Sequence, residues 1–359
     1  MADGSNIVVE TALRILQDHS TPAVINDAEA GHWPAALWDT LEESGLTLAW
    51  VPDTLGGAGA DVADGFGVLR VAGEFAAPVP LAETLIAGFL LARAGLQVPE
   101  GPMTMAPVHA LDRLELGQDG RLRGIARDLL FARWSRHIML LARRGGEDCV
   151  ALVATADAMV EPGQNLAGEP SDQVVFDGVT PRAITLASGV DAMALTALGA
   201  AVRSVQMAGA LKRCLDQALL HAADRVQFGR PIGNFQVIQH NLAQFAGEVA
   251  AATAAADAAA EAICGGGLTD EATLAEIATA KIRVGEAAGI GSAIAHQVHG
   301  AMGFTYEHSL HHATRRLWAW RDEFGNEAYW SILLGGIAAR QGADAFWSFV
   351  SGTGTAAQR

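Results

Sequence analysis

Arg225, Phe228, Gln236 and Gln297 have the side-chain types that bind a ligand carrying a diphosphate and a flat ring. Arg225 ends an alanine-rich helical stretch and precedes a turn marked by a glycine and a proline. A guanidinium there offers a planar fork of donors that suits a diphosphate, and Phe228 adds a flat apolar face. Taken alone, Arg225 also fits a helix cap or an ion pair with a surface carboxylate. The interpretation therefore depends on the rest of the motif.

A histidine-rich segment near the C-terminus is a second group of side chains that could do chemistry. It contains Glu307, His308, His311 and His312. The H-E-x-x-H order of zinc enzymes is absent, and the same segment carries two arginines, which would repel a cation. The cysteines are widely spaced and form no C-x-x-C pair, at Cys149, Cys214 and Cys264. The sequence therefore predicts no metal site.

Two spaced motifs carry a family resemblance. The pattern R-x-x-F-G-x-P-I-x-x-F-Q-x-x-Q-x-x-L-A begins at Arg225, and Q-x-x-G-x-x-G begins at Gln297. Together they resemble the acyl-CoA dehydrogenase family, and the first motif is matched at each of its stated positions. The resemblance implies that Arg225, Phe228, Gln236 and Gln297 contact FAD. It also implies that these residues reach the FAD of a neighbouring subunit across a dimer interface.

The resemblance further implies contacts along the cofactor by Gly300 and Ala301, where Ala301 keeps a backbone N–H but adds a methyl group that many relatives lack. In the family, a central β-domain holds the flavin ring through Y-x-x-T-E/S-like and W-x-T/S segments. This chain departs from both. GPMTMAPV stands near the first, with Thr104 as its hydroxyl, and RWSRH stands near the second, with Trp134 and Ser135 as equivalents. Trp134 also fits a plain core or surface aromatic.

Chemistry of the family type needs a carboxylate that takes the α-proton of a bound thioester while a hydride leaves the β-carbon for flavin N5. Many relatives supply it as the Glu of E-G-T, at a set distance after the motif Gln. Others supply it on the first bundle helix, at a set distance before the motif Arg. In this chain the two positions hold Phe324 and Gly199. Glu323 is the nearest substitute and Asp322 the second, although both also fit surface charges paired with nearby arginines.

The resemblance leaves three functions open. In the first, the chain dehydrogenates an acyl-CoA with Glu323 or Asp322 as base and passes electrons to an electron-transfer flavoprotein or a related acceptor. In the second, it is a non-catalytic or half-site subunit that lends its motif residues to the FAD of a paralogous partner. In the third, it is a flavin-free bundle that serves interaction alone. We expect a homodimer or tetramer in the first case and a hetero-oligomer in the second.

The elements expected to position these residues form three domains and a tail. Residues 1–100 show helices punctuated by proline and glycine, and 101–188 show short β-branched runs that predict a small, β-barrel-like domain. Apolar residues at helical spacing predict a four-helix bundle over 189–351, with helices at 192–225, 235–264 and 271–299 and a fourth near Glu327. Residues 352–359 form the tail. This mainly α arrangement with a small β-domain is also the one that the resemblance implies.

The composition disfavours several classes of protein. The 359 residues are half hydrophobic, which suffices for a sizeable core in two or three domains. A formal net charge of −16 disfavours binding to nucleic acid or to an anionic membrane surface. The N-terminal sequence MADGSNIVVE lacks a basic region, and the apolar run around 85–91 is too short to span a bilayer. Because the cysteines show no disulfide pattern, we expect a soluble, cytoplasmic protein without a membrane span.

Overall fold

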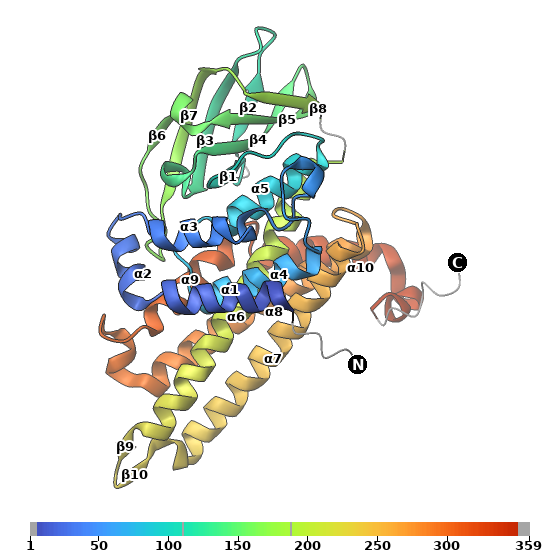
Figure 1. The fold of residues 1–359 in the computed structure, drawn as a ribbon. Helices are drawn as coiled ribbons and strands as arrows, with labels where there is room; N and C mark the ends of the chain where they lie inside the picture. Colours follow the sequence, from blue (N-terminus) through green and yellow to red (C-terminus); the bar gives the residue numbers. More distant parts are fainter. Residues whose placement is uncertain (1–5, 110, 187–188, 351–359) are drawn as a thin grey trace.

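Helices form the first and last parts of the chain, and a sheet lies between them, in the computed structural model, which describes residues 6–109, 111–186 and 189–350. Figure 1 shows the sheet at the top, the N-terminal helices across the middle, and the long bundle helices extending below both. The predicted architecture, mainly α with a small β-domain, is confirmed. The predicted tail over 352–359 lies outside the described residues.

The N-terminal layer contains the helices α1 (Ile7–His19), α2 (Pro22–Glu29), α3 (Ala35–Glu43), α4 (Val62–Glu74) and α5 (Leu81–Arg93). A proline begins α2, and Gly45 follows α3 in the left-handed conformation that ends many helices. Helix α5 is buried along most of its length, because its apolar residues join one core cluster with α6 and one face of the sheet. Thr84 on α5 accepts a hydrogen bond from the backbone N–H of Met103, at 3.0 Å, and so ties α5 to the first strand.

The sheet has the strand order β6-β7-β3-β2-β4-β5-β8, with β1 added beside β4. The strands are β1 (Met103–Ala106), β2 (Arg113–Leu116), β3 (Leu122–Leu130), β4 (His137–Arg144), β5 (Glu147–Ala154), β6 (Met159–Glu161), β7 (Ser171–Val179) and β8 (Ala183–Leu186). Alternate residues serve two cores: Met139 and Leu141 of β4 join the helical core, whereas Ile138 and Leu140 join a second cluster within the sheet domain. A register shift in β3 places Asp128 at φ +56°, which re-aims its side chain.

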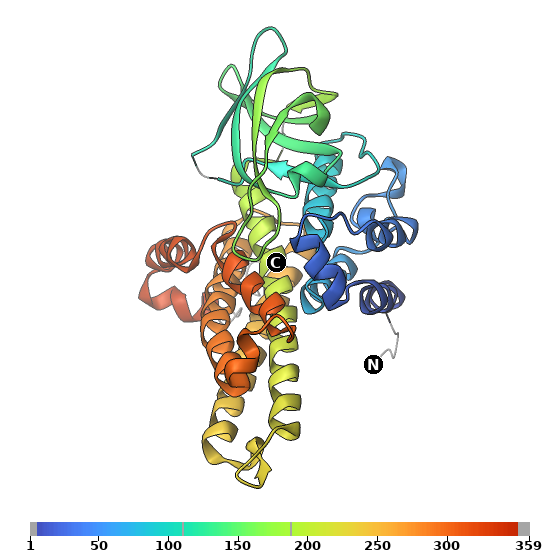
Figure 2. The same ribbon diagram turned by 90° about the vertical axis from the view of Figure 1, so that its left-hand side faces the viewer.

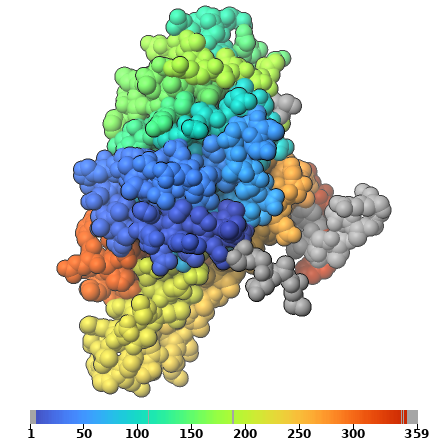
Figure 3. Space-filling model, in the orientation of Figure 1, coloured from blue at the N-terminus to red at the C-terminus, as the bar shows by residue number. Residues whose placement is uncertain are grey.

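The C-terminal part contains α6 (Ala192–Asp224), α7 (Gln236–Cys264), α8 (Glu271–His299), α9 (Leu310–Asp322) and α10 (Glu327–Val350). The three long helices expected from the periodicity therefore form within a residue of their predicted ends. The alanine-rich α7 buries small side chains, including Ala252, Ala256 and Ala259, which lets neighbouring helices approach closely. Figure 3 shows the lower end of the bundle projecting beyond the rest of the chain.

Helix α6 connects the layers, and Figure 2 shows it running from the sheet to the lower tip of the bundle. A Cβ at Gly73 of α4 would lie 2.0 Å from the carbonyl oxygen of Gln206, and one at Gly209 would lie 2.1 Å from that of Arg70. The two helices can approach this closely only because neither glycine carries a side chain. By length and composition, α6 is the one described helix that could cross a membrane, but 94% of its most apolar window is buried within the fold.

Candidate functional site

The four motif side chains converge at the lower end of the bundle. Arg225 follows the last residue of α6, Gln236 begins α7, and Gln297 lies in the last turn of α8. Phe228 lies in the turn between the short strands β9 (Val226–Gln227) and β10 (Arg230–Pro231). The ends of α6 and α8 are held together by a small apolar cluster with Ala222 and Val298, and by the stacked rings of His221 and His299, whose centroids are 4.6 Å apart. Segments separated in the sequence thus form one surface.

The side chains of Arg225 and Phe228 on this surface are exposed to solvent. Arg225 is exposed, and within the described part of the chain its guanidinium makes no ion pair. Its backbone is engaged, because the N–H donates to the carbonyl of His221 at 2.9 Å and the carbonyl accepts from the N–H of Ile232 at 2.8 Å. Phe228 is 93% exposed and has φ +51°, although its ring contacts Phe235 edge-on at a centroid distance of 6.1 Å. A free guanidinium beside an exposed ring can bind a phosphorylated ligand delivered from outside this chain.

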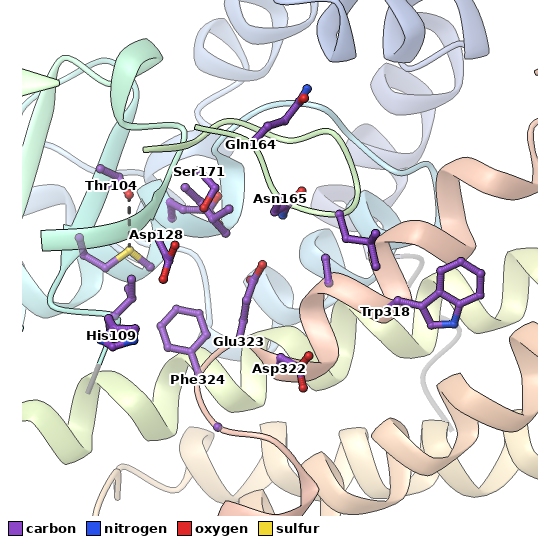
Figure 4. A pocket seen from close by; sticks show the side chains of 17 residues that line it. Thr104, His109, Asp128, Gln164, Asn165, Ser171, Trp318, Asp322, Glu323 and Phe324 are labelled. Atoms are coloured by element: carbon purple, nitrogen blue, oxygen red, sulfur yellow. Dashed lines mark hydrogen bonds between the residues drawn. The ribbon is translucent and has the colours of Figure 1, made fainter. Parts of the chain in front are cut away.

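A cavity of about 540 Å³ lies at the other end of the bundle, between the sheet and α9 (Figure 4). Strand β1 contributes Thr104, β3 contributes Asp128 and Leu130, and the loop before β7 contributes Asn165. The lining also includes Glu83, Met105, Val108, His109, Gln164, Leu166, Ser171, Trp318, Ala319, Asp322, Glu323, Phe324 and Gly325. Walls from all three parts of the chain therefore enclose one space, which is suited to a ligand of small-molecule size.

The predicted site residues divide into those that line this cavity and those that do not. Thr104, Asp322 and Glu323 line it. In Figure 4, Glu323 extends toward the space between Asp128 and Asn165, whereas Asp322 points to the other side. Trp134 and Ser135 are absent from the lining, because they follow β3 in a 3₁₀ turn that faces the N-terminal helices. The Trp134 ring packs against Trp33 at 5.5 Å, and the Ser135 hydroxyl donates to the carbonyl of Phe131 at 3.0 Å.

Phe324 and Gly199, the two positions that the family resemblance marks for the carboxylate, meet in space. A Cβ built on Gly199 would lie 2.3 Å from the ring of Phe324, so the ring rests on the bare backbone of α6. Phe324 is buried and has φ +54°, and its carbonyl accepts a hydrogen bond from the Trp330 indole at 3.0 Å. Counting along the sequence identified both positions, but only the structure shows that an aromatic ring fills the place where they converge.

Glu323 belongs to a buried ion-pair cluster that the sequence analysis missed. Arg203 of α6 is 2% exposed, and its Nε donates to Glu323 Oε2 at 2.6 Å. The same guanidinium donates to the carboxylate of Glu83 on α5 and to the side-chain oxygen of Gln206. Burial raises the pKa of Glu323 above the usual range of a glutamate, against the opposing effect of Arg203, and it does the same to the pKa of Glu83. The available sequence signal was an arginine inside an otherwise apolar helical stretch.

A buried lysine fixes the segment that carries these carboxylates. The Lys281 ammonium on α8 donates to the carbonyl oxygens of Trp320 at 3.0 Å and Arg321 at 2.7 Å, which are free at the C-terminal end of α9. Burial lowers the pKa of Lys281 to about 8. A cation at a helix C-terminus also interacts favourably with the helix dipole. Lys281 therefore holds the C-terminal end of α9, directly before the Asp322–Phe324 segment.

The histidines of α9 and its preceding loop bond to neighbouring protein groups. His311 Nδ1 lies 2.7 Å from the carbonyl oxygen of His308, and His312 Nε2 lies 2.8 Å from the side-chain oxygen of Asn26. Burial lowers the pKa of His312 to about 3. Across residues 6–109, 111–186 and 189–350, no group of three histidine, cysteine or acidic side chains has the arrangement of a metal site.

Comparison with known proteins agrees with this geometry. Residues 190–328 match the family model described as acyl-CoA dehydrogenase, C-terminal domain. Acyl-CoA dehydrogenase IpdE2 of Mycobacterium tuberculosis is 30% identical over 305 residues, which cover 84% of this chain and 87% of that protein. The ChsE4-ChsE5 complex from Mycobacterium tuberculosis contains a chain that matches with a TM-score of 0.83 at 22% identity, covering 96% of this chain and 99% of that one. Butyryl-CoA dehydrogenase from Megasphaera elsdenii gives 0.80 at 19% identity, covering 94% and 99%.

The two solved structures show a shared fold, and the IpdE2 match extends the likeness to the sequence over most of the chain. The family resemblance that the Arg225 and Gln297 motifs predicted is therefore confirmed. On this evidence the chain belongs to the acyl-CoA dehydrogenase family of oxidoreductases.

Proposed function

We propose that the chain carries out FAD-dependent α,β-dehydrogenation of an acyl-CoA thioester, with Glu323 as the group that accepts the α-proton. The observation that carries this proposal is the position of Glu323. Its carboxylate lies at the wall of the cavity between sheet and bundle, held by a buried arginine, directly before the residue that fills the family's carboxylate position. Asp322 remains the second candidate, and its exposed side chain points away from the space that Glu323 enters.

The residues present fit FAD in two places. At the lower end of the bundle, the free guanidinium of Arg225, the exposed ring of Phe228 and the exposed amides of Gln236 and Gln297 suit a diphosphate and its nucleoside. In the cavity, Thr104 and the backbone of β1 form one wall. When bound, FAD supplies the acceptor for the β-hydride. Because the two places lie at opposite ends of α6, we propose that the lower end serves a neighbouring subunit.

Within the cavity, this chain's own residues provide the proton chemistry. Glu323 is partly desolvated, and its raised pKa makes it a stronger base than a carboxylate in water. The electron pair of the α-carbon C–H bond stays with the substrate while the proton moves to the carboxylate. The hydrogen bond from Arg203 holds the carboxyl group in one orientation, and its positive charge favours the ionised form that can accept the proton.

Anaerobic flavin bleaching tests the proposal. The chain is purified alone, its FAD content per chain is measured, and a panel of acyl-CoA thioesters of different length and ring content is added without an electron acceptor. We expect at least one thioester to bleach the flavin and yield its enoyl-CoA. Re-oxidation by an electron-transfer flavoprotein or a related acceptor identifies the electron partner. Stoichiometric FAD with no bleaching by any thioester contradicts catalysis by this chain alone.

A second candidate function is that of a half-site subunit, which completes the FAD site of a paralogous partner that owns the base. One observation favours it, namely that the ring of Phe324 fills the position that the family resemblance marks for the carboxylate. One solved relative was crystallised as the ChsE4-ChsE5 complex. We extend a pairing of two different chains to this protein as part of the proposal.

Co-expression with a paralogous acyl-CoA dehydrogenase from the same genomic neighbourhood separates the candidates. A half-site subunit is expected to give a mixed oligomer with one FAD for two chains and bleaching only in the mixed form. A self-sufficient enzyme gives a homo-oligomer with one FAD per chain. A colourless chain under both conditions would support the third function, a flavin-free interaction module. Light scattering supplies a further check, because a monomer that retains stoichiometric FAD would exclude donation of FAD contacts between subunits.

A further inference from the structure

We infer that Arg203 is a positioning residue that couples Glu323 to a second cavity carboxylate, Glu83, so that the two carboxyl groups gain and lose protons as one unit. This inference deepens the proposed function and rests on it. Its experiment is chosen so that the coupling and the dehydrogenation can fail separately.

The coupling has a defined geometry. Arg203 Nε donates to Glu323, one terminal nitrogen donates to Glu83, and the other donates to Gln206 one turn along the same helix. Each arm of the planar fork therefore has its own acceptor, which fixes the orientation of the guanidinium. Glu83 comes from the first turn of α5, and Glu323 directly follows α9. The Arg203 side chain of the bundle thus joins the N-terminal layer to the segment after α9 that carries Glu323.

Aromatic rings and burial keep the cluster in place. The Arg203 guanidinium carbon lies 5.4 Å from the centre of the Trp320 ring and 5.9 Å from that of Phe324. Glu83 is as buried as Arg203, at 2% exposure, whereas the Glu323 side chain keeps 20% of its surface accessible where it lines the cavity. Glu323 is therefore the more accessible member of the cluster, whereas Glu83 belongs to the cavity wall with almost none of its surface exposed.

Charge counting explains why the carboxylates respond to each other. A single guanidinium faces two carboxylates, so it cannot neutralise both when both are ionised. Glu169, in the loop before β7, also acts on the carboxylates of the cluster. The other charged or titratable groups around it are Lys281 of α8, Asp322 of α9, the pair between Arg321 of α9 and Glu327 of α10, and His109 and Asp128 in the cavity lining. Glu169 is itself paired with Arg316 at 3.1 Å. The raised pKa values of Glu83 and Glu323 agree with the retention of a proton between them.

The consequence concerns the strength of the base. An ionised Glu83 offsets part of the positive charge of Arg203. Because less of that charge then favours the ionised form of Glu323, the proton affinity of Glu323 rises. A neutral group in place of Glu83 leaves the whole guanidinium charge to Glu323, which then holds a proton less tightly. Glu83 therefore tunes the α-proton acceptor without touching the substrate, which makes it a positioning partner and not a catalytic residue.

A double-mutant cycle with proton titration tests the coupling. Glu83→Gln keeps the size and the hydrogen bond to Arg203, so the variant is expected to fold. The titration of Glu323 is read by pH-difference infrared spectra of the carboxyl band, as wild type minus Glu323→Gln, and again in the Glu83→Gln background. We expect the midpoint of Glu323 to fall by roughly one pH unit in that background. Glu271→Gln, which breaks an exposed pair with Arg340, is the matched control and leaves the midpoint unchanged.

The acid limb of the pH profile for flavin bleaching is the second readout, and it is expected to move to lower pH in Glu83→Gln by the same amount. An unchanged Glu323 midpoint in the Glu83→Gln background would overturn the coupling, whether or not the enzyme bleaches. A shifted midpoint in a protein that no thioester bleaches would instead retain the coupling and remove the proposed function of this chain alone.

Discussion

The lower end of the bundle and the cavity below the sheet differ in how well their residues match the family motifs and in how deeply their side chains are buried. The lower end keeps the FAD motif position by position, and its side chains are exposed and free of ion pairs within the described residues. The cavity has Phe324 and Gly199 at the two positions that the family resemblance marks for a carboxylate, yet it holds a buried cluster of ionisable groups. Under the proposed function, holding the cofactor and moving the proton would therefore belong to separate parts of this chain.

The difference has a physical cause. Arg225, Phe228 and Gln236 lie close together along the chain, where α6 ends and α7 begins, so the turn between these helices brings them together, and Gln297 joins them from the end of α8. The cavity cluster joins side chains from α5, α6 and the loop after α9, and it exists only when all three layers are packed. Substitutions at the lower end are expected to affect ligand binding, whereas substitutions in the cavity affect both chemistry and folding.

The largest expected effect is on chemistry at the cavity. Glu323→Gln keeps the size and the hydrogen bond from Arg203 but removes the ability to accept a proton. We expect the rate of flavin bleaching by an active acyl-CoA to fall by about 10²-fold or more, with FAD content unchanged. Stopped-flow absorbance measures the rate, and Asp322→Asn is the matched control. Retained bleaching in Glu323→Gln would eliminate Glu323 as the base and would return attention to Asp322.

The second effect is on the pH dependence of stability. The pKa of Lys281 falls from 10.5 to about 8 on folding, so between these pH values the unfolded chain binds a proton that the folded chain does not. The unfolding free energy should therefore rise with pH in this window, by on the order of 3 kcal/mol in total. Lys281→Met should remove that rise, and urea unfolding of both proteins at several pH values checks it. Parallel profiles for the two proteins would show that Lys281 has an ordinary pKa in the folded state.

The third effect contrasts the exposed end with the buried cavity. Arg225→Ala removes a charge-assisted contact to the diphosphate and is expected to weaken FAD binding by roughly 1.5 to 3 kcal/mol, tenfold or more in affinity. The melting temperature of the apoprotein should stay unchanged, because Arg225 is exposed and makes no ion pair in the described structure. Arg230→Ala in the same hairpin is the control for a general loss of positive charge. Normal flavin content together with a lowered melting temperature would make Arg225 structural.

The smallest expected effect tests whether the two lost carboxylate positions touch. Gly199→Ala places a methyl group against the Phe324 ring. Overpacking of this kind lowers the free energy of unfolding by about 1 to 3 kcal/mol. The better helix propensity of alanine offsets about 1 kcal/mol of that loss. We expect a net loss of about 1 kcal/mol in chemical denaturation. The double variant Gly199→Ala/Phe324→Leu should recover most of the loss. Additive losses in the double variant would mean that the ring does not rest on Gly199.

The sequence by itself determined the features that depend on short stretches of chain. Helical periodicity predicted the three long bundle helices within a residue, β-branched runs predicted the strands that became β4, β5 and β7, and the Arg225 motif predicted the family. Each of these signals is local, because a helix period, a strand period or a motif at a helix end can be recognised in a short stretch of sequence, whatever packs against it. The predicted roles of Thr104, Trp134 and Ser135 at the flavin ring stay predictions.

Only the tertiary structure decided how distant residues pair. Nothing in the sequence indicated that Arg203 would face Glu83 and Glu323, or that Phe324 would rest on Gly199, because each pair joins segments on different helices or loops. The turn after β3 likewise directed Trp134 toward the N-terminal helices and left Asp128 and Leu130 at the cavity. Such contacts arise from the packing of whole layers. The burial of apolar surface sets the positions of the helices. Charged side chains that are buried where those helices meet are stable only when they are paired there.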